Sequence, residues 1–141
     1  PWTEWRGLRA RGAAPLAAGE NVAGDAAFDA LLAAQAVTVV QPDVAKWGGI
    51  SGCLPVIRRV QAAGLRYCPH YLGGGIGLLH SGHLLAAVGG DGLLEVDANE
   101  NPLRSLLCGG LNAVEEGVAR LGERPGIGIE PDLAALRALC A

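Results

Sequence analysis

The stretch VTVVQPDVAKWGGISG, residues 37–52, decides how the chain is expected to fold. It opens with a run of mostly β-branched residues, of the kind that packs well in a buried strand. Two charged residues, Asp43 and Lys46, follow almost directly. A buried strand that ends in a charge is typical of a sheet whose strand ends form a rim, where a charged group meets solvent or a substrate.

An apolar run that ends in a chemically active residue occurs four times in the chain. The runs lie at 14–20, 36–43, 65–70 and 92–97, and their active residues are Glu20, Asp43, His70 and Glu95. These four residues are 23, 27 and 25 positions apart. Between the runs, helical spacing and glycines at the segment ends predict helices at 25–36, 51–64 and 76–90, with Ser51 as a cap and Pro55 in the first turn.

A repeat in the mid-twenties with one strand and one helix per unit is typical of consecutive right-handed βα units. Nearly continuous apolar strands indicate a parallel sheet that is covered on both faces. We therefore predict the α/β class and the C-terminal half of a (β/α)8 barrel, a fold that needs about 250 residues when complete. The predicted organisation is a half barrel of about four units over 1–97, with the end of an earlier helix at 3–12, and a tail over 98–141.

Beyond residue 98 the alternation of strands and helices stops. We expect a loop at 99–110 and a hairpin or two extended segments at 115–130, with the turn at the RPG sequence, 124–126. A closing helix is expected at 131–140, because Pro131 suits the first turn of a helix.

Composition limits the classes of partner. The 141-residue chain has a formal net charge of -3, and its 11 Lys and Arg residues are scattered, so no basic stripe is available to follow a nucleic-acid backbone. Charge, Gly or Pro interrupts every apolar stretch well short of the roughly 18 residues of a membrane span. We therefore expect a cytoplasmic protein without a targeting segment, which binds neither nucleic acid nor membrane.

The sequence contains four cysteines and no methionine. Cys53, Cys68, Cys108 and Cys140 include no CxxC pair, so we expect four buried thiols instead of a zinc site or a disulfide framework. Because no residue of the chain can be the translation start, we expect the chain to be a piece of a longer protein.

Six motifs together resemble the C-terminal half of a mandelate racemase/muconate lactonizing enzyme, a branch of the enolase superfamily. They are AGEN (18–21), QPDVAKWGGISG (41–52), PH (69–70), HLLAAV (83–88), LLEVD (93–97) and PGIGIEPD (125–132). Each motif is weak alone, but six in the family's order and spacing are specific. Asp43 stands where muconate lactonizing and dipeptide epimerase relatives carry Lys, so the chain is more similar to the mandelate racemase subgroup.

The resemblance implies a role for each active residue. Glu20 matches the last of three carboxylates that hold Mg²⁺, and Asp43 with His70 matches an Asp-His dyad. Glu95 matches an acidic residue that donates a hydrogen bond to the substrate carboxylate. Lys46 is similar to a common basic residue three positions after the Asp, and we assign it no chemistry.

The resemblance also implies an activity and what the chain lacks for it. A proton α to a carboxylate is very weakly acidic, so its removal needs a cation and hydrogen-bond donors that stabilise the enediolate. We expect a Mg²⁺-dependent acid-sugar dehydratase that acts on aldonates or aldarates, or else a racemase or epimerase of 2-hydroxy acids. Absent from the chain are the N-terminal capping domain, the first strands, a Lys-x-Lys motif and two of the three Mg²⁺ carboxylates.

A second hypothesis of a different class is an inactive half barrel with only a structural or assembly role. We expect the 141-residue chain alone to be inactive and to bind Mg²⁺ weakly, because one carboxylate of three is present. An open half barrel also exposes two sheet edges, so association into a homo-oligomer is expected.

Each assignment has a plainer alternative. Glu20 could be a rim carboxylate paired with Arg, and Asp43 could merely cap a turn or helix. Asp97 could stand at the rim in place of Glu95. These alternatives stay open at the level of sequence, and so does the role of Trp47, which we expect at the mouth.

Two further patterns are ambiguous. The glycine run GGGIG (73–77) lacks the Lys-Ser/Thr of a phosphate-binding P-loop, so it is either a structural loop or a flexible loop whose N–H groups meet an anionic substrate. His80 and His83 could form a zinc site with His70, but a helix on the outside of a barrel would point them away from the rim.

Overall fold

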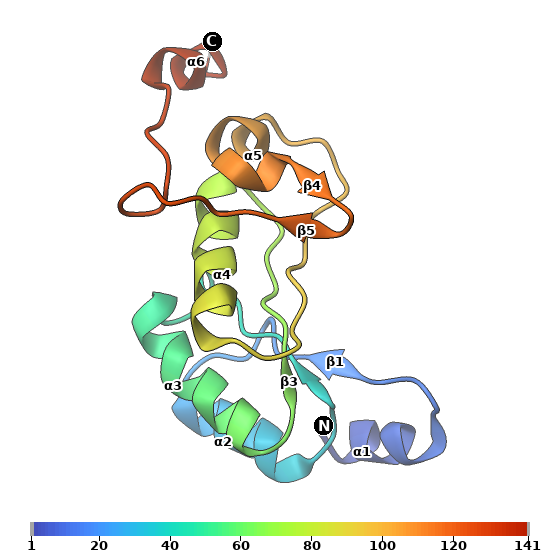
Figure 1. The fold of residues 1–141 in the computed structure, drawn as a ribbon. Coiled ribbons are helices and arrows are strands. Elements are labelled where there is room, and N and C mark those ends of the chain that lie inside the picture. Colours follow the sequence, from blue (N-terminus) through green and yellow to red (C-terminus); the bar gives the residue numbers. More distant parts are fainter. Residues whose placement is uncertain (1, 141) are drawn as a thin grey trace.

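The computed structural model describes residues 2–140, and its centre is a three-stranded parallel sheet. The strands lie side by side in chain order, as β1 (Ala17–Ala18), β2 (Val39–Val40) and β3 (Arg66–Tyr67) (Figure 1). In the register of the sheet, Ala17 is opposite Val39, and Val39 is opposite Arg66. The predicted α/β class with parallel strands is therefore confirmed.

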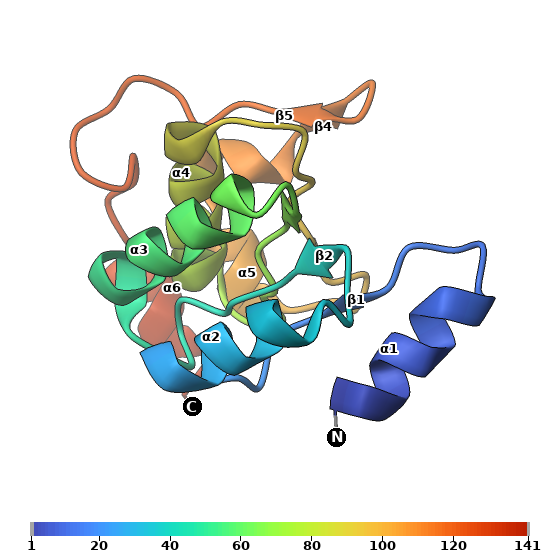
Figure 2. The ribbon, with the colours of Figure 1, turned by 90° about the horizontal axis from the view of Figure 1, so that it is seen from below.

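Helices alternate with these strands as predicted. They are α1 (Trp2–Arg11), α2 (Asp25–Ala34), α3 (Gly49–Ala62) and α4 (Gly75–Val88). Figure 2 shows α1 beyond β1, at the edge of the molecule, where it contacts α2. Crossovers between parallel neighbours are almost always right-handed, so α2 and α3 cover the same face of the sheet. Within residues 2–140, every helix is too short or too polar to span a bilayer.

The ends of α3 are set by glycines. The predicted cap, Ser51, lies inside the helix, which starts at Gly49 after Gly48 in the left-handed conformation (φ 68°). Pro55 consequently falls in the second turn and not in the first. At the other end the prediction is confirmed, because Gly64 has φ 69° and closes the helix in a left-handed cap.

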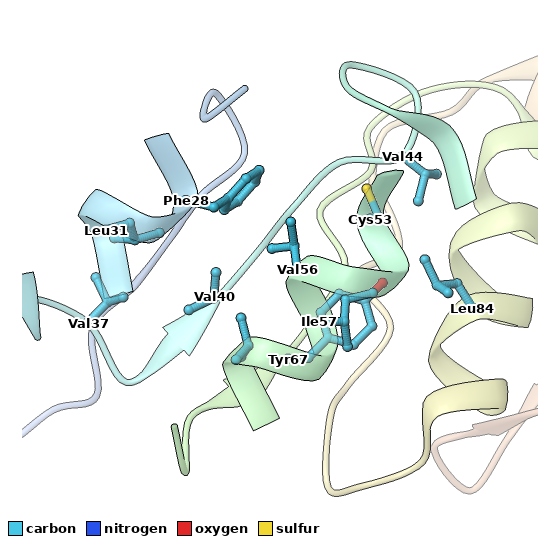
Figure 3. Close-up of a cluster of buried hydrophobic side chains, with 11 residues drawn as sticks. Phe28, Leu31, Val37, Val40, Val44, Cys53, Val56, Ile57, Tyr67 and Leu84 are labelled. Atoms are coloured by element: carbon cyan, nitrogen blue, oxygen red, sulfur yellow. The ribbon is translucent and has the colours of Figure 1, made fainter. Parts of the chain in front are cut away.

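A single apolar cluster joins the sheet to the helices (Figure 3). Its buried members are Phe28, Leu31, Val37, Val40, Val44, Cys53, Val56, Ile57, Val60, Tyr67 and Leu84. Burying one large apolar side chain contributes about 1.5–3 kcal/mol. Beside this cluster, the ring of Trp47 packs on Phe28 with centroids 5.3 Å apart, which anchors the loop after β2 to the core.

The strand predicted at 92–97 is not a strand in the structure. The segment runs beside β3 without a regular ladder of backbone hydrogen bonds. The backbone N–H of Leu93 donates instead to the side-chain Sγ of Cys68 (3.3 Å). Gly92 approaches so closely that a Cβ there would clash with the carbonyl oxygen of Tyr67. The segment therefore follows the sheet without the even hydrogen-bond spacing of a parallel pair.

The tail packs against α4 through a second, smaller cluster, in which Leu78, Leu79, Cys108 and Leu111 are buried. Its elements are α5 (Pro102–Leu107), the 3-10 helix η1 (Gly109–Asn112), the hairpin strands β4 (Val114–Glu115) and β5 (Val118–Ala119), and α6 (Leu133–Ala138). In Figure 1 α5 and the hairpin surround one end of α4, and α6 lies at the end of an extended segment.

Two predictions for the tail are wrong. The segment 99–110 is mostly helical, because the side chain of Asn101 caps α5 and Pro102 occupies its first position. The hairpin turns at Glu116 and Gly117 (φ 50° and 77°) and not at 124–126. The closing helix is confirmed as the shorter α6, which Asp132 caps.

All four cysteines are free thiols. Cys53, Cys68 and Cys108 are buried as predicted, whereas Cys140, which follows α6 near the end of the chain, is exposed. Burial raises the pKa of Cys53 to about 11, with a smaller contribution from the negative charge of Asp43. The interior thiols are therefore unreactive parts of the core.

Candidate active site

His70 lies just beyond the end of β3, and its ring faces the end of β2. Its Nδ1 is 3.0 Å from the Oδ2 of Asp43. Both side chains are buried, with Asp43 4% and His70 6% exposed. Because β2 and β3 are parallel neighbours, their C-terminal ends lie at the same edge of the sheet. This brings Asp43 and His70, which are 27 positions apart in the sequence, into contact.

Asp43 makes two sets of contacts, one within the turn after β2 and one with His70. Its Oδ1 accepts hydrogen bonds from the backbone N–H of Ala45 (2.8 Å) and of Lys46 (3.3 Å), so it caps the turn after β2. Its Oδ2 remains for His70. The turn therefore holds the carboxylate in one orientation.

Two further carboxylates lie near the other ring nitrogen. The Nε2 of His70 is 3.3 Å from the Oε2 of Glu20 and 3.9 Å from the Oε2 of Glu95. The backbone N–H of Tyr71 donates to the same oxygen of Glu95 (3.3 Å). Glu20, Asp43 and Glu95 thus surround one imidazole, although the strand predicted before Glu95 did not form.

The structure differs from the two simpler interpretations, in which Glu20 pairs with an arginine and Asp97 replaces Glu95 at the rim. The hydrogen-bond and ion-pair partners of Glu20 within residues 2–140 are Asn21 and His70, and no arginine is among them. Asp97 accepts hydrogen bonds from Asn99 and pairs with Arg104, and His70 is not among its partners within residues 2–140. Glu95, not Asp97, therefore faces the site.

This arrangement suits proton transfer. An imidazole whose Nδ1–H donates to a carboxylate has a lone pair on Nε2, which can accept a proton. The carboxylate then stabilises the charged ring. His70 and Asp43 have this relation, with Nε2 directed to the open side where Glu20 and Glu95 lie half-exposed.

The residues that the structure describes do not make a complete metal site. Among them no three His, Cys, Asp or Glu side chains are placed to hold an ion together. Glu20 offers a hard, half-exposed carboxylate of the kind Mg²⁺ prefers, so it fits as one ligand of a larger set. His80 and His83 interact with the carbonyl oxygens of Ile76 and Ile127 and do not join His70.

The glycine run 73–77 has a structural explanation. A Cβ at Gly77 would clash with the ring of Tyr71, and one at Gly73 would lie 2.7 Å from its hydroxyl oxygen. A Cβ at Gly75 would clash with the backbone where α5 ends. Burial, and secondarily the charge of Asp43, raises the pKa of Tyr71, so its phenol stays protonated.

The sequence did not single out two groups that contact the site. The backbone N–H of Tyr71 holds Glu95, and a main-chain donor leaves no residue-type signal. Asn21 donates from its Nδ2 to the Oε1 of Glu20 (3.0 Å). Its place directly after Glu20 in the AGEN motif is the signal that could have identified it.

Comparison with known proteins gives consistent results. The family model described as Enolase C-terminal domain-like matches residues 2–135. A crystal structure of a mandelate racemase/muconate lactonizing enzyme from Bordetella bronchiseptica RB50 superposes with a TM-score of 0.94 and 63% identity, over 99% of this chain and 39% of that one.

Two curated proteins are also similar to the chain. D-galactarolactone cycloisomerase from Agrobacterium fabrum is 32% identical over an alignment of 138 residues that covers 92% of this chain and 36% of that protein. Arabinonate dehydratase from Saccharolobus solfataricus is 31% identical over 101 residues, 72% of this chain and 27% of that protein. The chain thus spans between about a quarter and two fifths of these relatives, as an α/β fragment consistent with part of a TIM-barrel domain.

Proposed function

Because this chain belongs to the Enolase C-terminal domain-like family of mandelate racemase/muconate lactonizing enzymes, we propose that the protein of which it forms part removes the proton α to the carboxylate of an acid sugar. The proposed reaction is a Mg²⁺-dependent dehydration. The observation that carries the proposal is His70, whose Nδ1 meets a buried carboxylate while its Nε2 faces the open side.

His70 is the proposed proton carrier. The Cα–H bond of the substrate breaks, its proton passes to Nε2, and its electron pair remains in the enediolate. The imidazolium then gives a proton to the β-hydroxyl as the Cβ–O bond breaks, so that water leaves. Asp43 accepts the Nδ1–H and stabilises the imidazolium between the two steps.

The two glutamates have separate proposed roles. Glu95 is proposed to donate a hydrogen bond to the substrate carboxylate from its place beside Tyr71. Glu20 is one ligand of Mg²⁺, and bound Mg²⁺ supplies positive charge that stabilises the enediolate oxygens. The remaining ligands would come from other parts of the protein to which this chain is proposed to belong.

Isomerisation of an acid-sugar derivative is the second candidate. It is favoured by the similarity to a cycloisomerase over 92% of the chain, whereas dehydration is favoured by the similarity to arabinonate dehydratase. Both reactions can begin with loss of an α proton, so His70 and Asp43 would serve either one. The product distinguishes them.

The 141-residue chain by itself is proposed to be inactive, with one Mg²⁺ carboxylate in place. Association with copies of itself is also proposed for the protein, because β1 is an edge strand of the described sheet.

The full-length protein provides the test. Incubation with Mg²⁺, deuterium oxide and a panel of aldonates and aldarates should give α-deuteration and a 2-keto product. His70→Asn should lower dehydration by about a hundredfold or more, which is typical for loss of a general acid-base group. His83→Asn, on the outer helix α4, is the matched control and should retain activity. Absence of α-exchange from the wild type, or dehydration that persists in His70→Asn, would refute the proposal.

A further inference from the structure

Lys46 stands out by composition and by place. It is the sole lysine of the chain, and the other ten basic residues are arginines. The ion pairs that the structure describes for the three site carboxylates are with His70 and, for Asp43, with Lys46. Lys46 is thus the permanent cation of a site that is otherwise rich in negative charge.

A chain of polar contacts runs from Lys46 to the carboxylate of Glu20. The Nζ of Lys46 donates to the Oδ1 of Asn21 (3.2 Å), and the Nδ2 of Asn21 donates to the Oε1 of Glu20 (3.0 Å). An asparagine amide has one accepting end and one donating end, and here each end meets the group that matches it. Glu20 therefore has its Oε1 engaged and its Oε2 turned to His70.

The backbone presets the position of Lys46. Its N–H donates to the Oδ1 of Asp43, and its Nζ is 3.9 Å from the Oδ2 of the same residue. The next residue, Trp47, is anchored on Phe28 in the core. The side chain of Lys46 thus bridges from the turn after β2 to the residues after β1.

We propose that Lys46 is a positioning residue that acts through Asn21 to orient the Glu20 carboxylate toward the reaction centre. The proposal rests on the function proposed above and extends it to a residue whose side chain contacts Asn21 and Asp43. A compact ammonium group can donate to Asn21 while it stays close to Asp43, a geometry that suits lysine more than the planar fork of arginine.

The contribution of Lys46 to stability is small, because the pair with Asp43 is half-exposed on the lysine side and such pairs contribute little. Its effect should appear in the site. Replacing a residue that orients a metal ligand typically costs about 10-fold to 100-fold in metal affinity or activity.

The experiment compares variants of the full-length protein. Lys46→Met should lower kcat for dehydration and Mg²⁺ affinity by about tenfold each, with a smaller change in KM. Lys46→Arg, which keeps the charge but replaces the compact ammonium group with a planar fork, should recover only part of the loss. Arg58→Met is the matched control: it removes one positive charge from an exposed position of α3 and should change neither quantity.

A double-mutant cycle tests the path through Asn21. If Lys46 acts through it, Asn21→Ala and the combination with Lys46→Met should each lose about tenfold, because both changes break the same chain of contacts. A combined loss of about a hundredfold would overturn the proposal. So would a Lys46→Met variant with unchanged kcat and Mg²⁺ affinity.

A measurement on the protein without metal or substrate tests the role of Lys46 independently of the proposed function. In metal-free protein labelled with ¹⁵N-asparagine, Lys46→Met should shift the side-chain amide signal of Asn21, and Arg58→Met should not. If the wild type lacks activity, the proposed function fails while this signal still decides whether the contact exists. An unchanged Asn21 signal would overturn the positioning role whatever the activity.

Discussion

The βα units and the tail bury their side chains in different ways. In residues 14–97, eleven buried side chains form one cluster that spans β2, β3 and three helices. Where the tail meets α4, four residues are buried, Leu78 and Leu79 from α4 and Cys108 and Leu111 from the tail, and the surrounding residues are only partly buried. The first region is held by a repeating apolar pattern, and the second by local caps and close glycine contacts, which suggests that the tail opens more easily.

Thiol labelling should show the largest difference between the regions. At pH 8, iodoacetamide should modify Cys140 at least about a thousandfold faster than Cys53, because the pKa of Cys53 is raised to about 11 and its thiol is buried. Cys108, whose pKa is raised by burial in the second cluster, should be intermediate if the tail opens locally. Peptide mass spectrometry over time gives the order. Labelling of Cys53 before Cys108 would reverse the assignment of the weaker region.

Matched leucine truncations give the next largest effect. Leu31 and Leu79 are each 1% exposed and each lies on a helix, one in each cluster. Leu31→Ala should lower the free energy of unfolding by about 4 kcal/mol, and Leu79→Ala by about 2.5 kcal/mol, because the looser cluster can relax around the cavity. Urea denaturation with unchanged m-values measures both. Equal losses would mean that the two clusters are equally rigid.

Two glycine substitutions give the smallest effects and opposite signs. Gly75→Ala should lower stability by about 2 kcal/mol, since its Cβ would clash with the backbone of Leu107 and Cys108 and push α5 away from α4. Gly7→Ala, in the open on α1, should raise stability by about 0.7 kcal/mol through helix propensity. Thermal unfolding followed by circular dichroism measures both shifts. If Gly75→Ala left the stability unchanged, the junction of α4 and α5 would have room for the additional methyl group.

The same contrast explains how far the sequence predicted the structure. Glu20, Asp43 and His70 could be placed together because each follows a strand of one parallel sheet, and residues at the same end of such strands must be neighbours. Glu95 lies beside His70 although the strand predicted before it did not form, because an apolar run indicates that a segment is buried beside the sheet but not that it forms a hydrogen-bonded ladder. Periodicity therefore predicted positions better than hydrogen bonding.

The tail was predicted poorly because its structure depends on single residues. Asn101 followed by Pro102 is a recognisable helix start, but the helix that it begins is only six residues long, too short to show a periodic apolar pattern over several turns. Glu116 in the left-handed region of the hairpin turn is uncommon for a residue other than glycine, asparagine or aspartate, so its sequence gives little warning. The link between Lys46 and Asn21 depends on side-chain reach across two strands, which no local pattern contains.

The two oxygens of the Asp43 carboxylate have different partners, and this determines what an asparagine at the same position would do. Main-chain N–H groups occupy Oδ1, so an asparagine at this position would keep its oxygen there and present its NH₂ group to the imidazole. The ring would then accept at Nδ1 and carry its hydrogen on Nε2, the atom that faces Glu20 and Glu95. A replacement that leaves the fold undisturbed would thereby exchange the hydrogen-bond donor and acceptor nitrogens of the imidazole.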